Sequence, residues 1–350
     1  ILLLGGSASL YTLKKDSADG RFLMWKITTK AIQKQPITGT SLGGFPAAYA
    51  ETQAEYMASG KATEQEKLVA GCPEYAFNEY LQIGLEQGLV GLALFIGWLG
   101  LLFYKGIKNK RYACCGGLMS LAIFAFSSYP LQLPEFWVVL IFLGVMSVTP
   151  DKDEIRENQA ESNGHRWGKQ IFFMGIAILG IGLFWMQKDH YKAYQQWNKA
   201  QMFYNNKAYE AALEVYEPLY PLLKHKPEFL FEAAQSLSKT GQYEKANEYL
   251  ERAVLLSSDP MLYYVMAKNE QCLGEYRQAE KHLLHAIDIL PERIYPYYLL
   301  MNLYTEPSYF QPAKLKMAID SVLTKKPKVE SSAIKEMKEK ARSMLNNTSI

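Results

Sequence analysis

Residues 74–111 read EYAFNEYLQIGLEQGLVGLALFIGWLGLLFYKGIKNKR, a stretch that passes from polar residues directly into an apolar run. The apolar part, residues 87–104, is about long enough to cross a bilayer as a helix, which needs roughly 20 residues. It is followed by residues 105–111, which carry four basic side chains and no acid. The stretch therefore predicts a membrane-spanning helix with a basic loop at one end and polar side chains at the other.

The polar side chains before the apolar run share one face of the predicted helix. At about 100° per residue, Glu79, Gln82 and Glu86 fall within an arc of about 60°. Ionisable groups that face lipid cost roughly 3 kcal/mol each, so this face is expected to meet a water-filled cavity or to bind a polar group. Gly84 and Gly88 lie on roughly the opposite side, where small residues permit close approach of another helix. The alternative is a helix that begins near Gly88 and leaves the acids in solvent.

Three more apolar runs follow, at residues 112–129, 136–149 and 170–187. Short basic loops face the cytoplasm, and this rule places residues 105–111 inside the cell. Four crossings then place residues 13–83, and the chain beyond the last run, on the outer side of the membrane. Residues 84–187 are therefore expected to form a polytopic transmembrane helical bundle of about four spans.

The composition of the chain divides at the end of the last apolar run. Residues 84–187 are rich in Leu, Ile, Phe and Gly, whereas residues 188–345 are rich in Lys, Glu, Tyr and Ala and are interpreted as a soluble domain. The opening residues 1–12, ILLLGGSASLYT, are apolar and are interpreted as the end of a further membrane helix that begins before this sequence. Residues 13–83 between them are expected to form a large loop outside the membrane.

Charge and cysteine content argue against two kinds of function. A net charge of +3 is too small to indicate a nucleic-acid partner. The four cysteines and five histidines show no spacing typical of metal ligands, so neither a metal nor another cofactor is expected.

The soluble part carries an internal repeat. An aromatic residue recurs at spacings of 34, 33 and 34, and an alanine follows each one three residues later. This pattern resembles the tetratricopeptide repeat, a pair of antiparallel helices with small residues at their contact. It predicts an α-solenoid over residues 188–345, with a degenerate fourth copy that caps the stack. The aromatic positions are Tyr209, Tyr243, Tyr276 and Phe310, the alanines after them are Ala212, Ala246, Ala279 and Ala313, and alanines nine residues before the first three are Ala200, Ala234 and Ala267.

A cationic helix is predicted within the loop of residues 13–83. The stretch GRFLMW places Arg21 and Trp25 four residues apart on one helix face, and Lys26 and Lys30 extend the helix. The forked guanidinium of an arginine at the outer membrane face suits a diphosphate, through charge-assisted hydrogen bonds. The alternative is an arginine that lies beside lipid headgroups and binds no substrate.

Two groups of motifs in this half of the chain resemble the O-antigen ligase and polymerase family of bacterial membrane glycosyltransferases. The first is Gly-Arg, a Trp four residues later, and a Pro-x-x-Gly-x-Gly-x-Gly-x-Phe loop. The second is His-Asn-x-x-Leu-Gln, a Glu, and a Gly-x-x-Gly-Leu that enters a membrane helix. The resemblance covers about residues 18–150. The corresponding positions are Gly20, Arg21, Trp25, Pro36, Gly39, Ser41, Gly43 and Phe45, then Phe77, Asn78, Leu81, Gln82, Glu86, Gly88, Gly91 and Leu92.

The resemblance implies transfer of a glycan from an undecaprenyl diphosphate carrier to an acceptor at the periplasmic face of the bacterial inner membrane. The acceptor is lipid A-core in ligases, a growing chain in polymerases and a protein hydroxyl in protein O-oligosaccharyltransferases. Such proteins use neither a nucleotide sugar nor a metal, and their arginines hold the diphosphate. Arg21 is therefore expected to act in catalysis. The residues expected to bind substrate are Trp25, Lys26, Gly39, Gly43, Asn78 and Gln82.

The chain departs from the family pattern where a histidine is thought to help activate the acceptor. Phe77 occupies that position, and residues 13–83 contain no histidine. The proton of the acceptor is therefore expected to pass to a carboxylate, with Glu79 and Glu86 as the catalytic candidates and Glu74 as a third. Ser41 also stands where the family has a glycine.

Three interpretations of function follow. The first is an O-antigen ligase whose repeats recruit an acceptor, a protein partner or another copy of the enzyme. The second is a polymerase or a protein O-oligosaccharyltransferase, which differs only in the acceptor. The third is a non-catalytic, membrane-anchored scaffold whose repeats do the binding. The missing histidine favours the third, whereas an anchor has no need for the polar groups of residues 78–86 at the bilayer edge.

Overall fold

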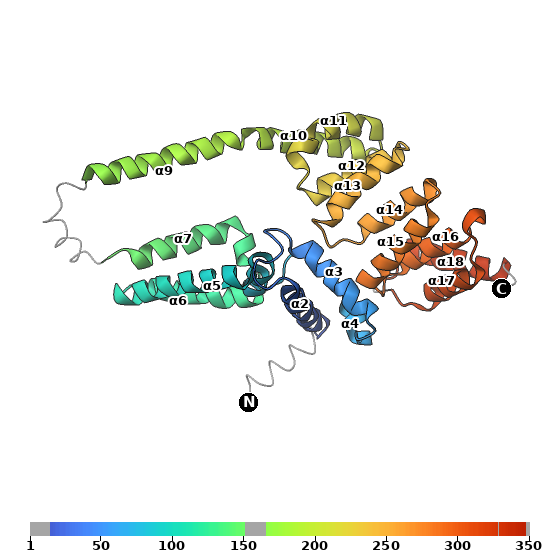
Figure 1. The fold of residues 1–350 in the computed structure, drawn as a ribbon, viewed down its shortest axis with the longest axis horizontal. Helices are drawn as coiled ribbons and strands as arrows, with labels where there is room; N and C mark the ends of the chain where they lie inside the picture. Colours follow the sequence, from blue (N-terminus) through green and yellow to red (C-terminus); the bar gives the residue numbers. More distant parts are fainter. Residues whose placement is uncertain (1–14, 151–165, 328, 348–350) are drawn as a thin grey trace. The chain divides into compact units, whose positions relative to one another are not determined.

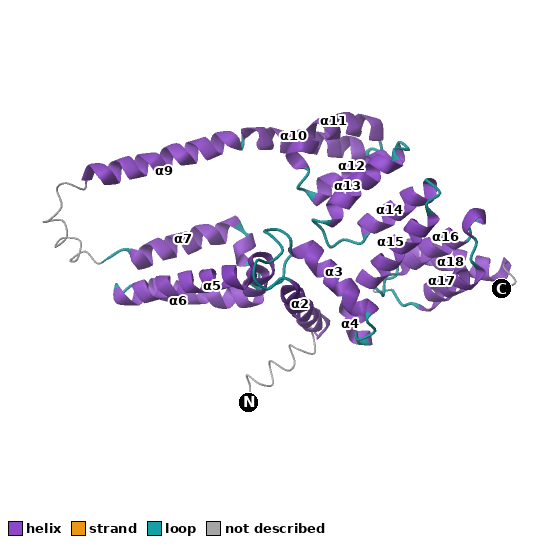
Figure 2. Ribbon diagram, viewed as in Figure 1, coloured by secondary structure: helices purple, strands orange, loops and turns teal. Residues whose placement is uncertain are grey.

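The computed structural model describes residues 15–150, 166–327 and 329–347, and within these ranges its regular elements are all helices (Figures 1 and 2). The predicted all-α fold class is therefore confirmed, while the expected helix end at residues 1–12 lies outside the described residues. The chain forms two compact units. One, called the apolar unit, comprises Gln35–Ser41 and Tyr75–Asn198, and the other, called the repeat unit, comprises Ile1–Lys34, Leu42–Glu74 and Lys199–Ile350.

The apolar unit is built on three helices that pack on one another. They are α5 (Glu79–Lys108), α6 (Tyr112–Ser127) and α7 (Pro134–Val148), with a 3₁₀ turn, η1 (Pro130–Gln132), between the last two. Leu102, Leu118 and Leu140 meet in the core of this group. The helix α9 (Arg166–Met186) follows after the residues that are not described. Three packed helices bury only their facing sides, so most of the remaining apolar surface is left outside.

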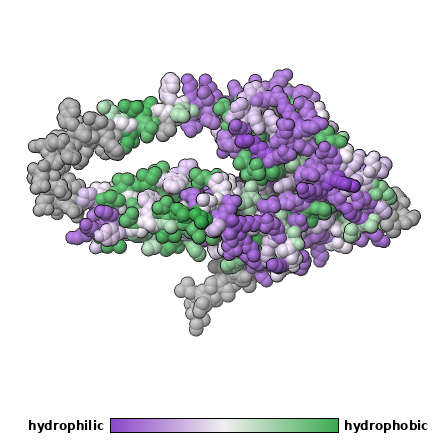
Figure 3. Space-filling model, in the orientation of Figure 1, coloured by the Kyte–Doolittle hydropathy of each residue, from purple (hydrophilic) through white to green (hydrophobic). Residues whose placement is uncertain are grey.

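The outer faces of these helices are apolar. Leu94, Ile123 and Phe142 are each more than half exposed, and Figure 3 shows hydrophobic residues gathered over the surface of α5–α7. Among the described residues, α5, with 30 residues, is long and apolar enough to cross a membrane. The helices α6 and α7 are apolar but shorter, with 16 and 15 residues. One such helix suggests membrane association weakly, and the expected bundle of about four spans stays a prediction.

Helical hairpins form most of the repeat unit. In chain order, the hairpins consist of α10 (Lys188–Asn205), whose first residues belong to the apolar unit, and α11 (Tyr209–Leu223), then α12 (Pro227–Lys239) with α13 (Tyr243–Val254), α14 (Met261–Cys272) with α15 (Tyr276–Ile289), and α16 (Ile294–Tyr304) with α17 (Pro312–Thr324). The alanines predicted at the helix contacts are almost fully buried in the first three pairs, from Ala200 to Ala279. A small side chain lets the two helix backbones approach closely, and the predicted tetratricopeptide-like solenoid is confirmed for these pairs.

The fourth pair does not follow the predicted alignment. Ala313 is exposed and Phe310 is 52% exposed, whereas Leu315 occupies the buried contact position. An extra 3₁₀ turn, η2 (Pro307–Tyr309), precedes α17, and Pro312 starts the helix, a position that suits proline because its missing N–H is not needed there. The alignment of Phe310 and Ala313 with the earlier copies was therefore wrong. The end of the stack is covered by a further helix, α18 (Ser332–Asn347), which packs on α17 and α16.

The segment before α5 is helical and joins the repeat hairpins. It contains α2 (Lys15–Lys34), α3 (Phe45–Ala58) and α4 (Glu64–Val69), and α3 packs against α15. The amide of Gln53, fully buried, donates hydrogen bonds to the carbonyls of Gly71 at 3.0 Å and Ile289 at 2.8 Å. The hydroxyl of Ser258 donates to the carbonyl of Pro73 at 3.1 Å. Residues 42–74 are thus held by the repeats through buried, directional contacts.

Replacing Ala279 with leucine should destabilise the protein, because the extra carbons have no space between α14 and α15. Overpacking of this kind typically costs about 1–3 kcal/mol, measurable as a lower midpoint of thermal unfolding. Ala313→Leu is the matched control, since Ala313 is exposed and should tolerate the change. Equal destabilisation by both variants would support the alignment of the fourth copy that the structure contradicts.

Candidate functional site at the break in α5

The start of α5 is fixed by two residues of the predicted second motif. Asn78 is extended and its side-chain oxygen accepts a hydrogen bond from the N–H of Leu81 at 3.0 Å, which caps the helix. Phe77 before it has a positive φ of 50°, unusual for a bulky residue. Its ring packs edge-on against the ring of Tyr129, with 4.8 Å between the ring centroids. The ring of Tyr75 stacks on that of Tyr129, with 5.2 Å between the centroids. The residue at the expected histidine position is therefore part of an aromatic cluster.

Glu79 joins the first turn of α5 to η1. Its side chain is 1% exposed. One carboxylate oxygen accepts a hydrogen bond from the N–H of Leu131 at 2.6 Å, and the other accepts from the amide of Gln132 at 3.2 Å. Because both oxygens are used, Glu79 has a clear role in positioning this turn.

Gln82 and Glu86 continue the buried polar stripe one and two turns later. The side-chain oxygen of Gln82 accepts from the N–H of Ala76 at 2.8 Å, and its amide donates to the carboxylate of Glu86 at 2.7 Å. Glu86 is 9% exposed. The polar stripe therefore lies inside the protein, and the alternative in which α5 begins near Gly88 with its acids in solvent is wrong. The polar groups that contact this stripe belong to the chain itself.

The helix is interrupted at Gly88. This residue has φ 70° and ψ −177°, a conformation essentially restricted to glycine, so the regular hydrogen bonds of α5 are lost around it. The carbonyls of Leu85 and Glu86 instead accept hydrogen bonds from the N–H groups of Thr40 at 2.9 Å and Ser41 at 3.0 Å. The N–H of Leu89 donates to the carbonyl of Pro36 at 2.8 Å. Residues 36–41, called the docking loop, satisfy the backbone groups that the break sets free.

The docking loop and the break approach each other more closely than side chains would permit. A Cβ atom on Gly88 would lie 2.0 Å from the carbonyl oxygen of Ile37, and one on Gly39 would lie 2.5 Å from the backbone of Glu86. The expected partner of Gly88, a neighbouring helix, is thus replaced by this loop. Ser41 has φ 96°, so the position where the family has glycine keeps a conformation that favours glycine.

The predicted cationic residues lie on α2 in the repeat unit. Arg21 is exposed and Trp25 is half-buried. The ammonium of Lys26 forms an ion pair with Glu66 at 2.7 Å and donates to the hydroxyl of Tyr56 at 2.6 Å. Burial favours the protonated form of Glu66, but hydrogen bonds from Lys26, the Thr63 N–H and the Tyr56 hydroxyl prevail and lower its pKa to about 2.

Sequence reasoning missed the partners of Lys26. Thr63 caps α4 and forms a capping box with Glu66, in which the threonine accepts from the N–H of Glu66 and the carboxylate accepts from the N–H of Thr63. The pattern Thr-x-x-Glu was readable in the sequence as a helix start. Nothing in the local sequence indicated that the same carboxylate pairs with a lysine on another helix.

The predicted site residues are divided between the two units. The apolar unit brings together Gly39, Gln82 and Glu86 at the break, with Asn78 and Glu79 at the start of α5. The repeat unit holds Arg21, Trp25 and Lys26 on α2. Gly43, also in the repeat unit, has φ 75°, and a Cβ added to it would meet no atom within 4 Å, so this glycine is required for its backbone conformation alone.

Comparison with protein families connects the N-terminal part with a known family. Residues 3–96 match the family described as O-antigen ligase. This range includes both groups of motifs, the docking loop and the break at Gly88. Residues 205–286 match the family described as anaphase-promoting complex, cyclosome, subunit 3. The first match supports the resemblance drawn from the motifs and leaves the particular reaction open.

No curated protein gives a significant match to the chain. Among solved structures, similarity is found to MamA from Desulfovibrio magneticus RS-1, with 17% identity over 42% of this chain and 76% of that protein and a TM-score of 0.34. A type III secretion chaperone, SycD of Yersinia enterocolitica in complex with a peptide of the translocator YopD, has 17% identity over 43% of this chain and 93% of that one, with a TM-score of 0.27.

Replacing Gly88 with alanine should detach the docking loop, because the new Cβ would overlap the Ile37 carbonyl and the backbone conformation would be strained. The expected cost is about 3 kcal/mol or more, seen as a lower unfolding midpoint and faster tryptic cleavage after Lys34. Gly97→Ala is the matched control on the same helix, since no atom lies near its Cβ position, and it should be neutral or stabilising by about 1 kcal/mol. Equal unfolding midpoints and equal cleavage rates for the two variants would contradict the close approach of Gly88 to the docking loop.

Glu66→Gln should weaken the attachment of α2 to α4 in a pH-dependent way. The folded-state pKa of Glu66 is depressed, so its ionised form stabilises the fold above the ordinary pKa of 4.5, and this contribution disappears as the pH falls to about 2. At neutral pH we expect the free energy of unfolding to fall by about 1–2 kcal/mol. Solvent screening at the partly exposed Lys26 limits the effect to this size. Denaturant unfolding at a series of pH values should show the two proteins converging in acid; a difference that is constant with pH would argue against the ion pair.

Proposed function

We propose that the protein is a membrane glycosyltransferase of the O-antigen ligase type. It transfers a glycan from an undecaprenyl diphosphate carrier to an acceptor such as lipid A-core, at the periplasmic face of the bacterial inner membrane. The observation that carries this proposal is the docking loop seated on the break at Gly88, beside buried Gln82 and Glu86, within the region that matches the O-antigen ligase family. A simple membrane anchor requires none of these features.

The proposed chemistry gives Arg21 and Glu86 separate roles. The acceptor hydroxyl attacks the anomeric carbon of the glycan, the bond from that carbon to the diphosphate oxygen breaks, and the undecaprenyl diphosphate leaves with the bonding electrons. Arg21 holds the leaving diphosphate through paired, charge-assisted hydrogen bonds. Glu86, which is buried beside Gln82 at the break, receives the hydroxyl proton.

The remaining residues position these groups. Asn78 caps α5, and Gln82 orients Glu86 through its amide. Gly39 allows the docking loop to reach the break. Trp25 and Gly43 stay proposed substrate contacts of the repeat unit. Lys26 forms an ion pair with Glu66, and we assign it to the attachment of α2 to α4.

The contacts inside the repeat unit support a particular membrane topology. Residues 42–74 and the hairpins after residue 199 form one compact unit, so the proposed topology has both on the same side of the membrane. The chain between them must then cross an even number of times. Four apolar helices, α5, α6, α7 and α9, satisfy this condition. The helices α6 and α7 are each at most about 24 Å long at 1.5 Å per residue, which is shorter than the bilayer core. If they enter the bilayer and return to the same side as a partial hairpin, α5 and α9 still make two crossings and the number stays even.

Two alternatives differ in measurable ways. A polymerase or a protein O-oligosaccharyltransferase would use the same donor and the same site, and only the acceptor would differ. A non-catalytic scaffold is favoured by one observation, the packing of Phe77 into an aromatic cluster where the family has a histidine. The scaffold would bind through its repeats and transfer no glycan.

Arg21→Ala in the full chain should abolish glycan transfer while membrane insertion stays normal. Loss of a charge-assisted hold on the leaving group corresponds to a rate reduction of about 100-fold or more. Transfer would be followed from a radiolabelled undecaprenyl-diphosphate glycan into lipid A-core, longer glycan and protein, separated on gels. Lys15→Ala, which removes a cation from the start of the same helix, is the control. Unchanged transfer by the Arg21 variant would reject the proposed role, and no transfer by the unaltered protein to any of these acceptors would favour the scaffold.

A further inference from the structure

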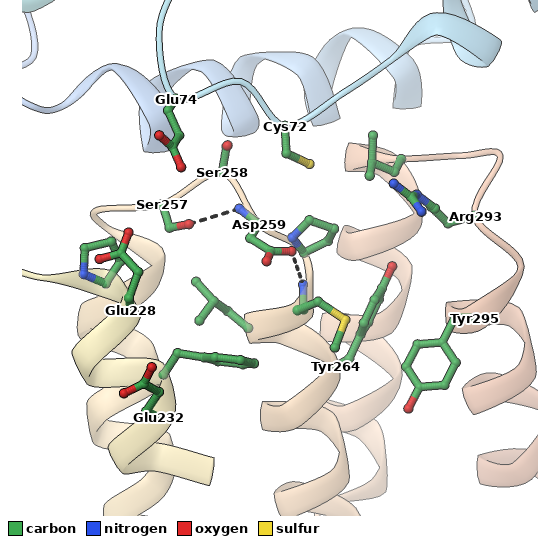
Figure 4. A pocket seen from close by; sticks show the side chains of 16 residues that line it. Cys72, Glu74, Glu228, Glu232, Ser257, Ser258, Asp259, Tyr264, Arg293 and Tyr295 are labelled. Carbon is green, nitrogen blue, oxygen red and sulfur yellow. Dashed lines mark hydrogen bonds between the residues drawn. The ribbon is translucent and has the colours of Figure 1, made fainter. Parts of the chain in front are cut away.

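A large cavity lies within the repeat unit, away from the residues assigned to glycan transfer. Its volume is about 860 Å³, within the range of sites that bind small molecules or peptide segments. Figure 4 shows that its walls come from α12, from the turn before α14 and from the start of α16, with Cys72 and Glu74 on the segment that borders it. The cavity is therefore a composite of the repeats and of a segment that lies outside them in sequence.

The cavity is strongly acidic. Its lining includes four carboxylates, those of Glu74, Glu228, Glu232 and Asp259, and one guanidinium, that of Arg293. Figure 4 shows Glu228 and Glu232 on the same wall, across the cavity from Arg293. Low-dielectric walls concentrate the field of such a charge excess, so the site attracts cations and disfavours phosphate-bearing lipids or glycans.

A buried hydroxyl in the cavity wall lacks a hydrogen-bond partner. Tyr264 is 3% exposed, and within the described part of the chain its hydroxyl is one of two buried side-chain atoms that form no hydrogen bond. The ring is held edge-on by Tyr295 at 5.3 Å, and Figure 4 shows the hydroxyl on the side of the ring that faces Arg293 and Cys72. A buried donor without an acceptor is unfavourable, and an acceptor from a ligand would remove that cost.

The lining also offers apolar contact beside the acids. Phe231, Leu262 and Pro260 line the same cavity as the carboxylates and Tyr264. The long stem of a lysine or arginine packs on apolar and aromatic surface while its charged end reaches a carboxylate. An extended peptide backbone supplies carbonyl oxygens, the acceptors that the Tyr264 hydroxyl requires.

We propose that this cavity binds an extended segment of a partner protein that carries a lysine or arginine side chain. The cationic end lies among Glu228, Glu232 and Glu74, the side-chain stem lies over Phe231, and a backbone carbonyl of the segment accepts the hydrogen bond of Tyr264. Charge complementarity favours this occupant over an anionic glycan acceptor. The inference does not depend on the proposed glycan transfer.

The test uses the full chain in detergent and an array of random dodecapeptides. Bound peptides should be enriched in lysine and arginine, and a selected peptide should bind about tenfold more weakly when its basic residues are replaced with glutamine. Glu228→Lys should weaken binding of the selected peptide by at least a similar factor. Glu214→Lys, at an exposed position of α11 outside the cavity, is the control and should not.

Tyr264→Phe separates binding from folding. Because the hydroxyl has no partner in the unliganded protein, its removal should leave the unfolding midpoint unchanged or raised, while affinity for the selected peptide falls several-fold. Selection of neutral or acidic peptides, no selection at all, or equal affinity of the Glu228 variant would overturn the proposal. A Tyr264 variant that loses stability would show that the hydroxyl is already satisfied within the fold.

Discussion

The hydrogen bonds between the docking loop and the break in α5 are the constraint on which the candidate site depends. A helix that is broken near a membrane exposes backbone carbonyl groups, and lipid offers them no hydrogen-bond donor. Each unpaired carbonyl group in an apolar environment costs roughly several kcal/mol. The N–H groups of Thr40 and Ser41 meet the carbonyls of Leu85 and Glu86, and this is possible only because Gly39 and Gly88 lack side chains. Once the loop is seated, the polar side chains before the break are fixed inside the protein.

A second constraint comes from the union of residues 42–74 with the repeat hairpins. The buried amide of Gln53 bridges the carbonyls of Gly71 and Ile289, so the segment that leads toward α5 is held by the repeats. The repeats therefore do more than offer a surface for recruitment, because they fix the backbone a few residues before Asn78. The same contacts make the loop and the repeats parts of one compact unit, and the proposed topology, in which both lie on one side of the membrane, is built on this observation.

The sequence predicted features that recur with a fixed period and missed those that depend on distant contacts. The spacing of Ala212, Ala246 and Ala279 revealed the hairpins, but the inserted turn before Pro312 shifted the fourth copy and no periodic signal marked it. The helical spacing of Glu79, Gln82 and Glu86 indicated one shared polar face, whereas the groups of the chain that bury this face were not predicted. The break at Gly88 was not predictable, since its conformation is maintained by a loop about fifty residues earlier in the chain. Likewise, the capping box of Glu66 was readable, whereas its pairing with Lys26 was not.

The distribution of charge separates the two kinds of binding that are proposed for this protein. An anionic diphosphate requires a cation such as Arg21, and the acidic cavity among Glu74, Glu228 and Glu232 would repel both the carrier and a phosphorylated lipid acceptor. The repeats are thus unsuited to collect the anionic substrates of a ligase at this cavity, although they were an obvious candidate for that task. A cationic protein segment can occupy the cavity without competing for the diphosphate. Because Glu74 borders the cavity and lies four residues before the helix cap Asn78, an occupant there would contact the chain just before it enters α5.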